Sequence, residues 1–192
     1  YKKFEDYSTE KPIKVFSRED LKDINYPLIE VRTNGVLKQT LMLPVSEREN
    51  FVNYTSGSGQ IITTNGAIIS KTNGFNVNLI SVDLNNDSPL LFLKKPHEWP
   101  KESYRKYSYL TPLNSIKNFD FKCEFNIKKI EIVEIVEKKY NLYKIVENCF
   151  NSKYNFKNLY WADKSGFIWK SKQFLKKDIF ADVYIINKTK PF

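Results

Sequence analysis

Side chains able to carry out catalysis are few in this chain of 192 residues. His97 is the only histidine, so a hydrolytic triad would have to pass through it, and the sequence contains no Gly-x-Ser-x-Gly nucleophile turn. A histidine base also needs an orienting partner and a nearby nucleophile. We therefore interpret His97 as a surface residue, and we expect no catalytic residues and no enzyme activity.

Residue types that hold cofactors and metals are equally scarce. Six glycines leave little room for a phosphate-binding loop. Glu131, Glu134 and Glu137 lie close together in the sequence, but on a strand Glu134 points away from the other two, which indicates a solvated strand face. One histidine and two cysteines without Cys-x-x-Cys spacing do not make a zinc site. We expect no cofactor and no metal.

Cys123 and Cys149 are the two cysteines of the chain. Both are expected to point inward from neighbouring strands. A disulfide would need a strand register that brings their Cα atoms within about 7 Å, and the sequence does not fix that register. A disulfide and two buried free thiols therefore both stay open, and the free thiols are favoured because unpaired cysteine is among the most buried residue types.

The densest group of aromatic residues lies near the C-terminus, in two runs that predict a β-hairpin. If residues 163–166 form its loop, Tyr160 and Trp169 face each other across the strands, and Trp161 lies on the opposite face. Both faces are then apolar. This pattern predicts a hairpin in the centre of a sheet, with both tryptophans in the core.

An alternative is that an aromatic ring of this region is exposed and stacks against sugar rings or bases. A basic surface beside such a ring would suit an anionic polymer. The candidate residues for binding a partner or a polymer are Tyr160, Trp161, Trp169, Lys170, Gln173 and Trp99.

The charge of the chain is basic, with 31 Lys and Arg against 22 Asp and Glu, a net charge of +9. All but four of the basic residues are lysine, whereas bidentate recognition of phosphates and guanine favours arginine. We therefore expect no nucleic-acid partner. The longest candidate apolar segment, Ile127–Val136, is interrupted by four charged residues and is far shorter than the roughly 20 apolar residues that span a bilayer.

Turn and strand signals dominate the rest of the chain. Asn-Gly pairs begin at Asn34, Asn65 and Asn73, and this dipeptide supplies the positive φ angles of tight hairpins. The strands predicted around these turns are Leu28–Arg32, Val36–Met42, Gln60–Thr63, Ala67–Lys71 and Phe75–Val82.

The second half shows the clearest strand pattern, because apolar residues occupy every second position from Phe119 to Ile127. Short helices are predicted over Ser17–Ile24 and Ser46–Phe51, and residues 85–114 are expected to form a long connection. Further strands are predicted over Ile130–Val136, Leu142–Phe150, Leu159–Ala162, Phe167–Gln173 and Ala181–Asn187. The expected fold is a mainly β, strongly twisted or barrel-like antiparallel sheet of about ten strands with a few short helices, in a single domain over residues 1–192.

The C-terminal hairpin carries a recognisable motif. Phe156–Asp163 reads FKNLYWAD and Ser165–Gln173 reads SGFIWKSKQ. These residues resemble the F-x-N-x-Y-W-V-D and G-x-(V/I)-W-K-S-x-Q ending of the YjbF/GfcB family of outer-membrane lipoproteins. Ile62–Phe75 is more loosely similar to the family's T-x-x-G-x-(I/V)-x-K-T-x-G-L segment. Ala162 departs from the C-terminal motif, where Val is usual, and Phe75 departs from the second segment, where Leu is usual.

The resemblance implies a non-enzymatic accessory in the secretion of a group 4 capsule or an exopolysaccharide, and it transfers no catalytic residue. It implies a domain tethered by an N-terminal lipid to the periplasmic face of the outer membrane. Its partners would be export proteins or an acidic polysaccharide. Since the chain begins at Tyr1, we expect the signal peptide and the lipid-bearing cysteine to lie upstream.

Two other functions stay open at this stage. One is a single-stranded nucleic-acid-binding β domain that stacks bases on Trp161 or Trp169. The other is a carbohydrate-active enzyme with paired carboxylates such as Asp83 and Asp87, which would need to face each other across a cleft.

Overall fold

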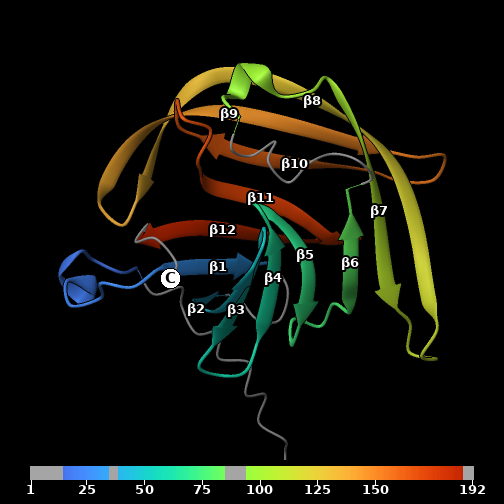
Figure 1. Cartoon of the computed structure of the whole chain (residues 1–192), viewed down its shortest axis with the longest axis horizontal. Helices are drawn as coiled ribbons and strands as arrows, with labels where there is room; N and C mark the ends of the chain where they lie inside the picture. The colour runs from blue at the N-terminus through green and yellow to red at the C-terminus, as the bar shows by residue number, and fades with distance from the viewer. Residues whose placement is uncertain (1–14, 35–38, 85–93, 188–192) are drawn as a thin grey trace, which may run out of the picture.

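β-Strands form nearly all of the regular structure (Figure 1). The computed structural model describes residues 15–34, 39–84 and 94–187. The strands of the first half are β1 (Leu28–Thr33), β2 (Gln39–Arg48), β3 (Phe51–Ser56), β4 (Ile61–Asn65), β5 (Ile68–Asn73) and β6 (Leu79–Asp83). Those of the second half are β7 (Glu102–Leu110), β8 (Ile116–Ile135), β9 (Lys138–Phe150), β10 (Asn155–Ala162), β11 (Ile168–Lys176) and β12 (Ile179–Asn187). Within the described residues, short 3₁₀ helices, η1 (Glu19–Leu21) and η3 (Pro96–Glu98), accompany them.

The twelve strands of the described ranges all belong to one sheet, in the order β5-β4-β3-β2-β1-β12-β11-β10-β9-β8-β7-β6. Neighbours in space are therefore neighbours in sequence, except where the first strand pairs with the last. The two edge strands, β5 and β6, approach each other, and the Thr72 hydroxyl of β5 donates to the carbonyl of Val77 just before β6 at 2.8 Å. The sheet is thus an up-and-down barrel that is nearly closed, with its seam between β5 and β6.

The barrel interior holds the main hydrophobic core, because side chains alternate between the two faces of each strand. On β8, Phe121, Cys123 and Phe125 point inward, as the period-2 pattern predicts. Within this interior, Phe156 stacks on Phe174 with ring centroids 4.0 Å apart, and Tyr107 contacts both Phe121 and Phe156 edge to face. The core therefore joins β7 and β8 to β10 and β11 through aromatic contacts.

The β8–β9 hairpin is long enough to bend over the outside of the barrel. Its strand register shifts between Ile127 and Ile130, so Lys128 and Lys129 form a bulge, and bulges bend the strand that carries them. Residues 128–143, here called the hairpin arm, fold back so that Val133 and Leu142 pack against Trp161 on the outer face. Figure 1 shows the arm at the left of the view.

The N-terminal segment fastens the tip of the hairpin arm. Ser17 and Asp20 exchange hydrogen bonds around the start of η1, a capping arrangement that agrees with the predicted helical turn. The Arg18 guanidinium donates to the carbonyl oxygens of Ile135 and Val136 at 3.2 and 2.7 Å. The backbone N–H of Arg18 also donates to Glu137 at 2.9 Å. The arm is therefore held at both its base and its tip.

The predicted fold class is confirmed, with twelve strands instead of about ten. Ile130–Val136 is not a separate strand, because the bulge keeps it paired with β9 as part of β8. The helix predicted over Ser46–Phe51 is wrong: Ser46–Arg48 end β2, Phe51 begins β3, and the two residues between them form the turn, where Glu49 has φ of +57°. The long connection is also partly wrong, because Glu102–Leu110 is β7.

One turn differs in position from the prediction. The predicted strands Ile130–Val136 and Leu142–Phe150 leave residues 137–141 as their connection, whereas the turn lies at Val136 and Glu137, which both have positive φ. The strand predicted over Val36–Met42 corresponds to β2, whose bounds are Gln39–Arg48. Residues 35–38, including the glycine of the Asn34-Gly35 turn, lie outside the described residues.

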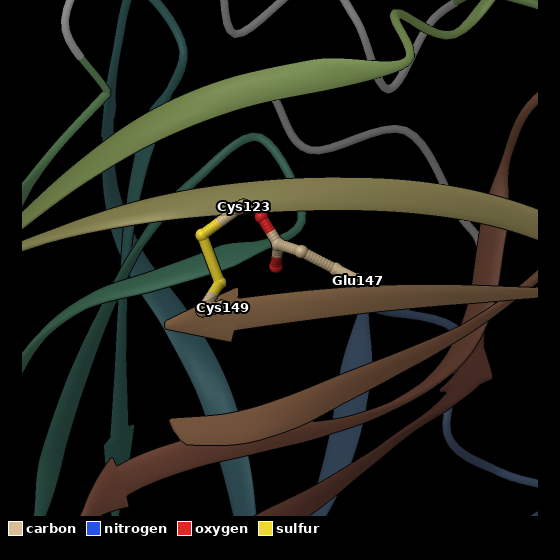
Figure 2. Close-up of side chains that lie close together, drawn as sticks. All are labelled: Cys123, Glu147 and Cys149. Atoms are coloured by element: carbon tan, nitrogen blue, oxygen red, sulfur yellow. A yellow bond between two sulfur atoms is a disulfide. The ribbon is translucent and has the colours of Figure 1, made fainter. Parts of the chain in front are cut away.

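Cys123 and Cys149 form a disulfide (Figure 2). The favoured alternative of two free thiols is therefore wrong. The reason is the register of β8 and β9, which places the two cysteines directly opposite each other with their Cα atoms 4.0 Å apart. Both side chains are buried in the core, so the bond ties the two longest strands together inside the barrel.

Removing the disulfide is expected to lower the free energy of unfolding. The bond closes a loop with a sequence separation of 26 residues. In the chain-entropy model, closing a loop of this size stabilises the fold by about 3 kcal/mol. Denaturant titration of the double variant Cys123→Ser/Cys149→Ser measures the loss, and the original chain unfolded with reductant is the control. An unchanged midpoint in both samples would contradict the expectation.

Candidate functional site

The β10–β11 hairpin lies in the middle of the sheet, as predicted, but its strand register differs from the prediction. Trp161 pairs with Lys170, and Tyr160 pairs with Ser171. The predicted facing of Tyr160 and Trp169 is wrong because Trp169 is an extra, bulged residue on β11. The bulge turns the indole of Trp169 to the outer face, where it shares a cluster with Trp161.

On the inner face, the hairpin surrounds a buried charge. The Arg105 guanidinium on β7 lies 3.0 Å from Glu147 Oε1 on β9, and these side chains are 1% and 0% exposed. The other carboxylate oxygen, Glu147 Oε2, accepts hydrogen bonds from the Asn158 amide at 2.8 Å and the Tyr160 hydroxyl at 2.9 Å. The Asn158 carbonyl oxygen in turn accepts from the backbone N–H of Phe174 on β11. The Glu147 carboxylate on β9 is therefore bound by side chains from β7 and β10, and through Asn158 it is linked to β11.

Burial controls the protonation of the groups around this carboxylate. Removal from water raises the pKa of Tyr160 well above its usual value, and the nearby Glu147 charge raises it further. The same two causes, in the same order, raise the pKa of Tyr107. Both phenols therefore stay neutral, and Tyr160 acts as a hydrogen-bond donor to Glu147.

A second inward residue, Gln173, connects opposite parts of the barrel. Its amide oxygen accepts from the backbone N–H of Ile69 at 2.9 Å, and its amide nitrogen donates to the carbonyl of Ala67 at 2.8 Å. The same nitrogen lies 2.9 Å from the hydroxyl of Ser171. Ile69 lies beside an irregularity in the β4–β5 ladder, so Gln173 satisfies backbone groups of the edge strand from across the interior.

On the outer face, Trp161 is surrounded by charged groups. Its indole N–H donates to Glu131 Oε2 at 3.0 Å, and Glu131 also pairs with Lys144 at 3.2 Å. Lys170 Nζ lies 4.6 Å from the centroid of the Trp161 ring and 4.9 Å from that of Tyr184. These are cation–π distances. Burial is the main reason that the pKa of Lys170 is lowered.

Trp169 is held by the loop of its own hairpin. Asp163 Oδ2 accepts from the indole N–H at 3.0 Å, while Oδ1 accepts from the backbone N–H groups of Ser165 and Phe167. The Trp169 ring also packs on Tyr140 of the hairpin arm, with centroids 4.4 Å apart. Burial alone would raise the pKa of Asp163, but these hydrogen bonds lower it.

The structure separates the six candidate binding residues into two groups. Trp161, Trp169 and Lys170 lie together on the outer face, with Trp161 6% exposed and the other two half-buried. Tyr160, Gln173 and Trp99 lie inside the barrel, where Trp99 contacts Tyr160 at 5.8 Å between ring centroids.

The residues around Trp161, Trp169 and Lys170 on the outer face are here called the outer-face cluster. Sequence reasoning missed several of them. Glu131 was interpreted as part of a solvated face, whereas it binds the Trp161 indole. Arg32 and Tyr184 also belong there, with the guanidinium 4.8 Å from the ring centroid. The alternation of polar and apolar residues in β1 and β12 indicates which faces these residues occupy. It does not reveal that the first and the last strand, which are far apart in the sequence, pair with each other.

Among the described residues, Cys123, Glu147 and Cys149 are the one group of three potential metal ligands within 4.8 Å of each other (Figure 2). Metal binding by cysteine requires free thiolates. Both sulfur atoms are joined in the disulfide, and Glu147 is held by Arg105, Asn158 and Tyr160. The arrangement therefore has a structural role.

Comparison with known proteins identifies the relationship. A family model described as "Group 4 capsule polysaccharide lipoprotein gfcB, YjbF" matches residues 2–181. The chain belongs to the YjbF family. The resemblance seen in the hairpin motif is thereby confirmed.

One solved structure agrees with this assignment at the level of the fold. The hypothetical lipoprotein YmcC from Escherichia coli K12 superimposes with a TM-score of 0.74 at 17% identity, over 93% of this chain and 91% of that one. A putative exported protein with a YmcC-like fold from Bacteroides fragilis NCTC 9343 matches at 12% identity with a TM-score of 0.36, covering 84% and 94% of the respective chains. Among curated protein sequences, none matches.

The residues of the YjbF motif have structural contacts in this chain. Asn158 and Tyr160 bind the buried carboxylate, Asp163 orders the hairpin loop, and Gln173 bridges the barrel. Trp161 anchors the hairpin arm. No helix within the described ranges is long and apolar enough to cross a membrane.

Replacing Glu147 by Ala is expected to cost about 3–5 kcal/mol of unfolding free energy, because it leaves the Arg105 charge buried without its partner. Thermal or denaturant unfolding measures this loss. The double variant Arg105→Met/Glu147→Leu should recover much of it, since both charges are removed. Glu102→Ala, which breaks the exposed pair with Lys122, is the control and should cost far less than Glu147→Ala, because solvent and salt screen an exposed pair. Equal losses for the buried and exposed pairs would refute the structural role of Glu147.

The outer-face cluster should weaken in acid. Hydrogen bonding from Trp161 is the main cause that lowers the pKa of Glu131 in the folded state. A lowered pKa means that the stabilisation is complete above the unfolded value, about 4, and is lost as the pH falls through the folded value. Glu131→Gln should therefore destabilise the protein by about 1 kcal/mol at pH 7 and by progressively less below pH 4. Unfolding followed by tryptophan fluorescence at several pH values measures this difference.

Glu134→Gln, on the exposed side of the same strand, is the matched control. It should change the free energy of unfolding by no more than about 0.5 kcal/mol at any pH. A Glu131→Gln effect that stays constant from pH 7 to pH 3 would contradict the assigned charge interaction.

Proposed function

We propose that this domain is held at the periplasmic face of the outer membrane by an N-terminal lipid. There it assists assembly or export of a capsule or exopolysaccharide without catalysing a reaction. It acts by binding the anionic polymer or a protein of the export apparatus. The observation that carries the proposal is the match of the capsule polysaccharide lipoprotein family to residues 2–181.

The structure supports the non-enzymatic part of the proposal. Several side chains of types that often take part in catalysis lie inside the core and are 0 to 1% exposed, namely Arg105, Glu147 and the two cysteines. Their contacts are with each other and with motif residues. A catalytic residue must instead contact a substrate, and these side chains present no surface to one.

The outer-face cluster supports the polymer-binding part. Strands β1, β11 and β12 bring Arg32, Lys170 and Lys172 into one cross-strand region with aromatic rings between them. Asp182 lies among these three cations, and Glu30 pairs with Arg32 at 2.6 Å, so three cations face two carboxylates and the region keeps an excess of one positive charge. Cations beside aromatic rings match a polymer that has apolar sugar faces and carboxylates.

The nucleic-acid alternative receives no comparable support. Stacking of bases requires an accessible ring face. Trp161 is 6% exposed, and Trp169 is half-buried between Phe167 and Tyr140. Of the carboxylates suggested for a carbohydrate-active enzyme, Asp83 is exposed at the end of β6, and Asp87 lies outside the described residues.

Binding to an acidic polysaccharide should depend steeply on salt. Polygalacturonate is the probe and neutral dextran the control, with affinity measured by calorimetry at 20 and 500 mM NaCl. Screening at the higher salt concentration should weaken polygalacturonate binding about tenfold or more. Lys172→Gln should weaken binding more than Lys117→Gln, a substitution at an exposed position at the far end of β8. Absent or salt-independent binding would contradict binding of the anionic polymer and would leave a protein of the export apparatus as the proposed partner.

A further inference from the structure

We propose that the convex side of the hairpin arm, residues 128–143, docks on the surface of a bilayer that contains anionic phospholipid. The inference rests on the proposed lipid anchoring, and it adds a second membrane contact made by the folded domain. The arm faces the barrel with one side only. Its other side is available to an external partner.

The apolar part of this surface comes from isoleucines with no place in the core. Ile130 and Ile132 are 49% and 70% exposed, and Ile127 at the base of the arm is 42% exposed. Alternation explains their direction, because Val133 and Ile135 pack toward the barrel while Ile130 and Ile132 point away from it. Three large apolar side chains are therefore exposed along one stretch of β8, and exposed apolar groups of this kind mark interaction surfaces.

Lysines border these isoleucines on both sides. Lys128 and Lys129 are exposed in the bulge, and Lys138 and Lys139 are exposed near the tip. The arm also carries three glutamates. Glu131 binds Trp161 and Lys144 on the side that faces the barrel, Glu134 lies opposite Lys139, and Glu137 accepts the backbone N–H of Arg18. The exposed charged side chains of the arm are therefore four lysines and two glutamates, an excess of two positive charges. Apolar side chains bordered by lysines are the pattern of surfaces that bind the interface of anionic membranes.

The path of the chain indicates why a membrane is the favoured partner. Arg18 fastens the N-terminal segment to the tip of the arm, and Val15, the first described residue, is 83% exposed. The described chain therefore begins beside the arm, and any lipid attached upstream is connected to the domain at that point. One weak membrane contact gives marginal binding, whereas a lipid and a basic apolar patch together give stable attachment.

The opposite end of β8 provides an internal comparison. Leu113 and Ile116 there are 90% and 62% exposed, so they match the arm in apolar exposure. Polar residues, including Asn114 and Ser115, surround them, and Lys117 is the adjacent basic residue. The two ends therefore differ mainly in positive charge and in their distance from the N-terminal segment.

Flotation of the 192-residue chain with vesicles tests the proposal without the lipid anchor. The vesicles contain either phosphatidylcholine alone or phosphatidylcholine with 30% phosphatidylglycerol. We expect binding to the anionic vesicles and at least tenfold weaker binding to the neutral ones. Ile132→Ser and the double variant Lys128→Glu/Lys129→Glu should each weaken the binding, about fivefold and more than tenfold respectively. Ile116→Ser is the matched control and should leave it unchanged.

A spectroscopic measurement locates the contact directly. Emission of Ile132→Trp should shift to shorter wavelength when anionic vesicles are added, and emission of Ile116→Trp should not. Circular dichroism confirms that each variant is folded, which is expected because both positions are exposed. Absence of vesicle binding, or equal effects at Ile132 and Ile116, overturns the proposal. Neither result affects the polysaccharide role, because polygalacturonate binding is measured separately in the absence of lipid.

Discussion

The barrel depends on the need to satisfy one negative charge in its interior. Glu147 is fully buried, and a carboxylate in an apolar environment is stable only with partners close by. Arg105 comes from β7, and Asn158 and Tyr160 come from β10, so the carboxylate fixes the relative positions of strands on both sides of β9. A shift of one residue in either strand would replace a partner with an outward-facing side chain. The charge therefore selects the register in a part of the sheet where apolar packing alone would tolerate alternatives.

This requirement explains the pattern of residues that the chain shares with its family. The motif combines Asn158, Tyr160, Ser171 and Gln173 on the inner face with two tryptophans and Asp163 on the outer face and loop. Each inner residue satisfies a buried polar group, and each outer residue holds the arm or the hairpin loop. A motif of this kind preserves a shape.

Local patterns in the sequence were sufficient for the fold class and for the central position of the C-terminal hairpin. The alternation from Phe119 to Ile127 identified the inner face of β8 correctly. Two of the errors lie at bulges: Trp169 reverses the expected face of an indole, and Lys128–Lys129 joins two predicted strands into one. A bulge depends on which distant residues pair, and neither propensity nor period reports that. The disulfide was missed for the same reason, because it required the register of β8 and β9.

The order of the strands has a consequence for synthesis of the chain. Each ladder except one joins segments that are adjacent in sequence, so successive hairpins assemble locally as the chain lengthens. The exception is the ladder between β1 and β12, which brings together Leu28 and Asn187. The ring of strands cannot be completed until its last member has left the ribosome. Until then β1 keeps an unpaired edge, and the polypeptide remains an open ribbon that can still be threaded through a narrow passage.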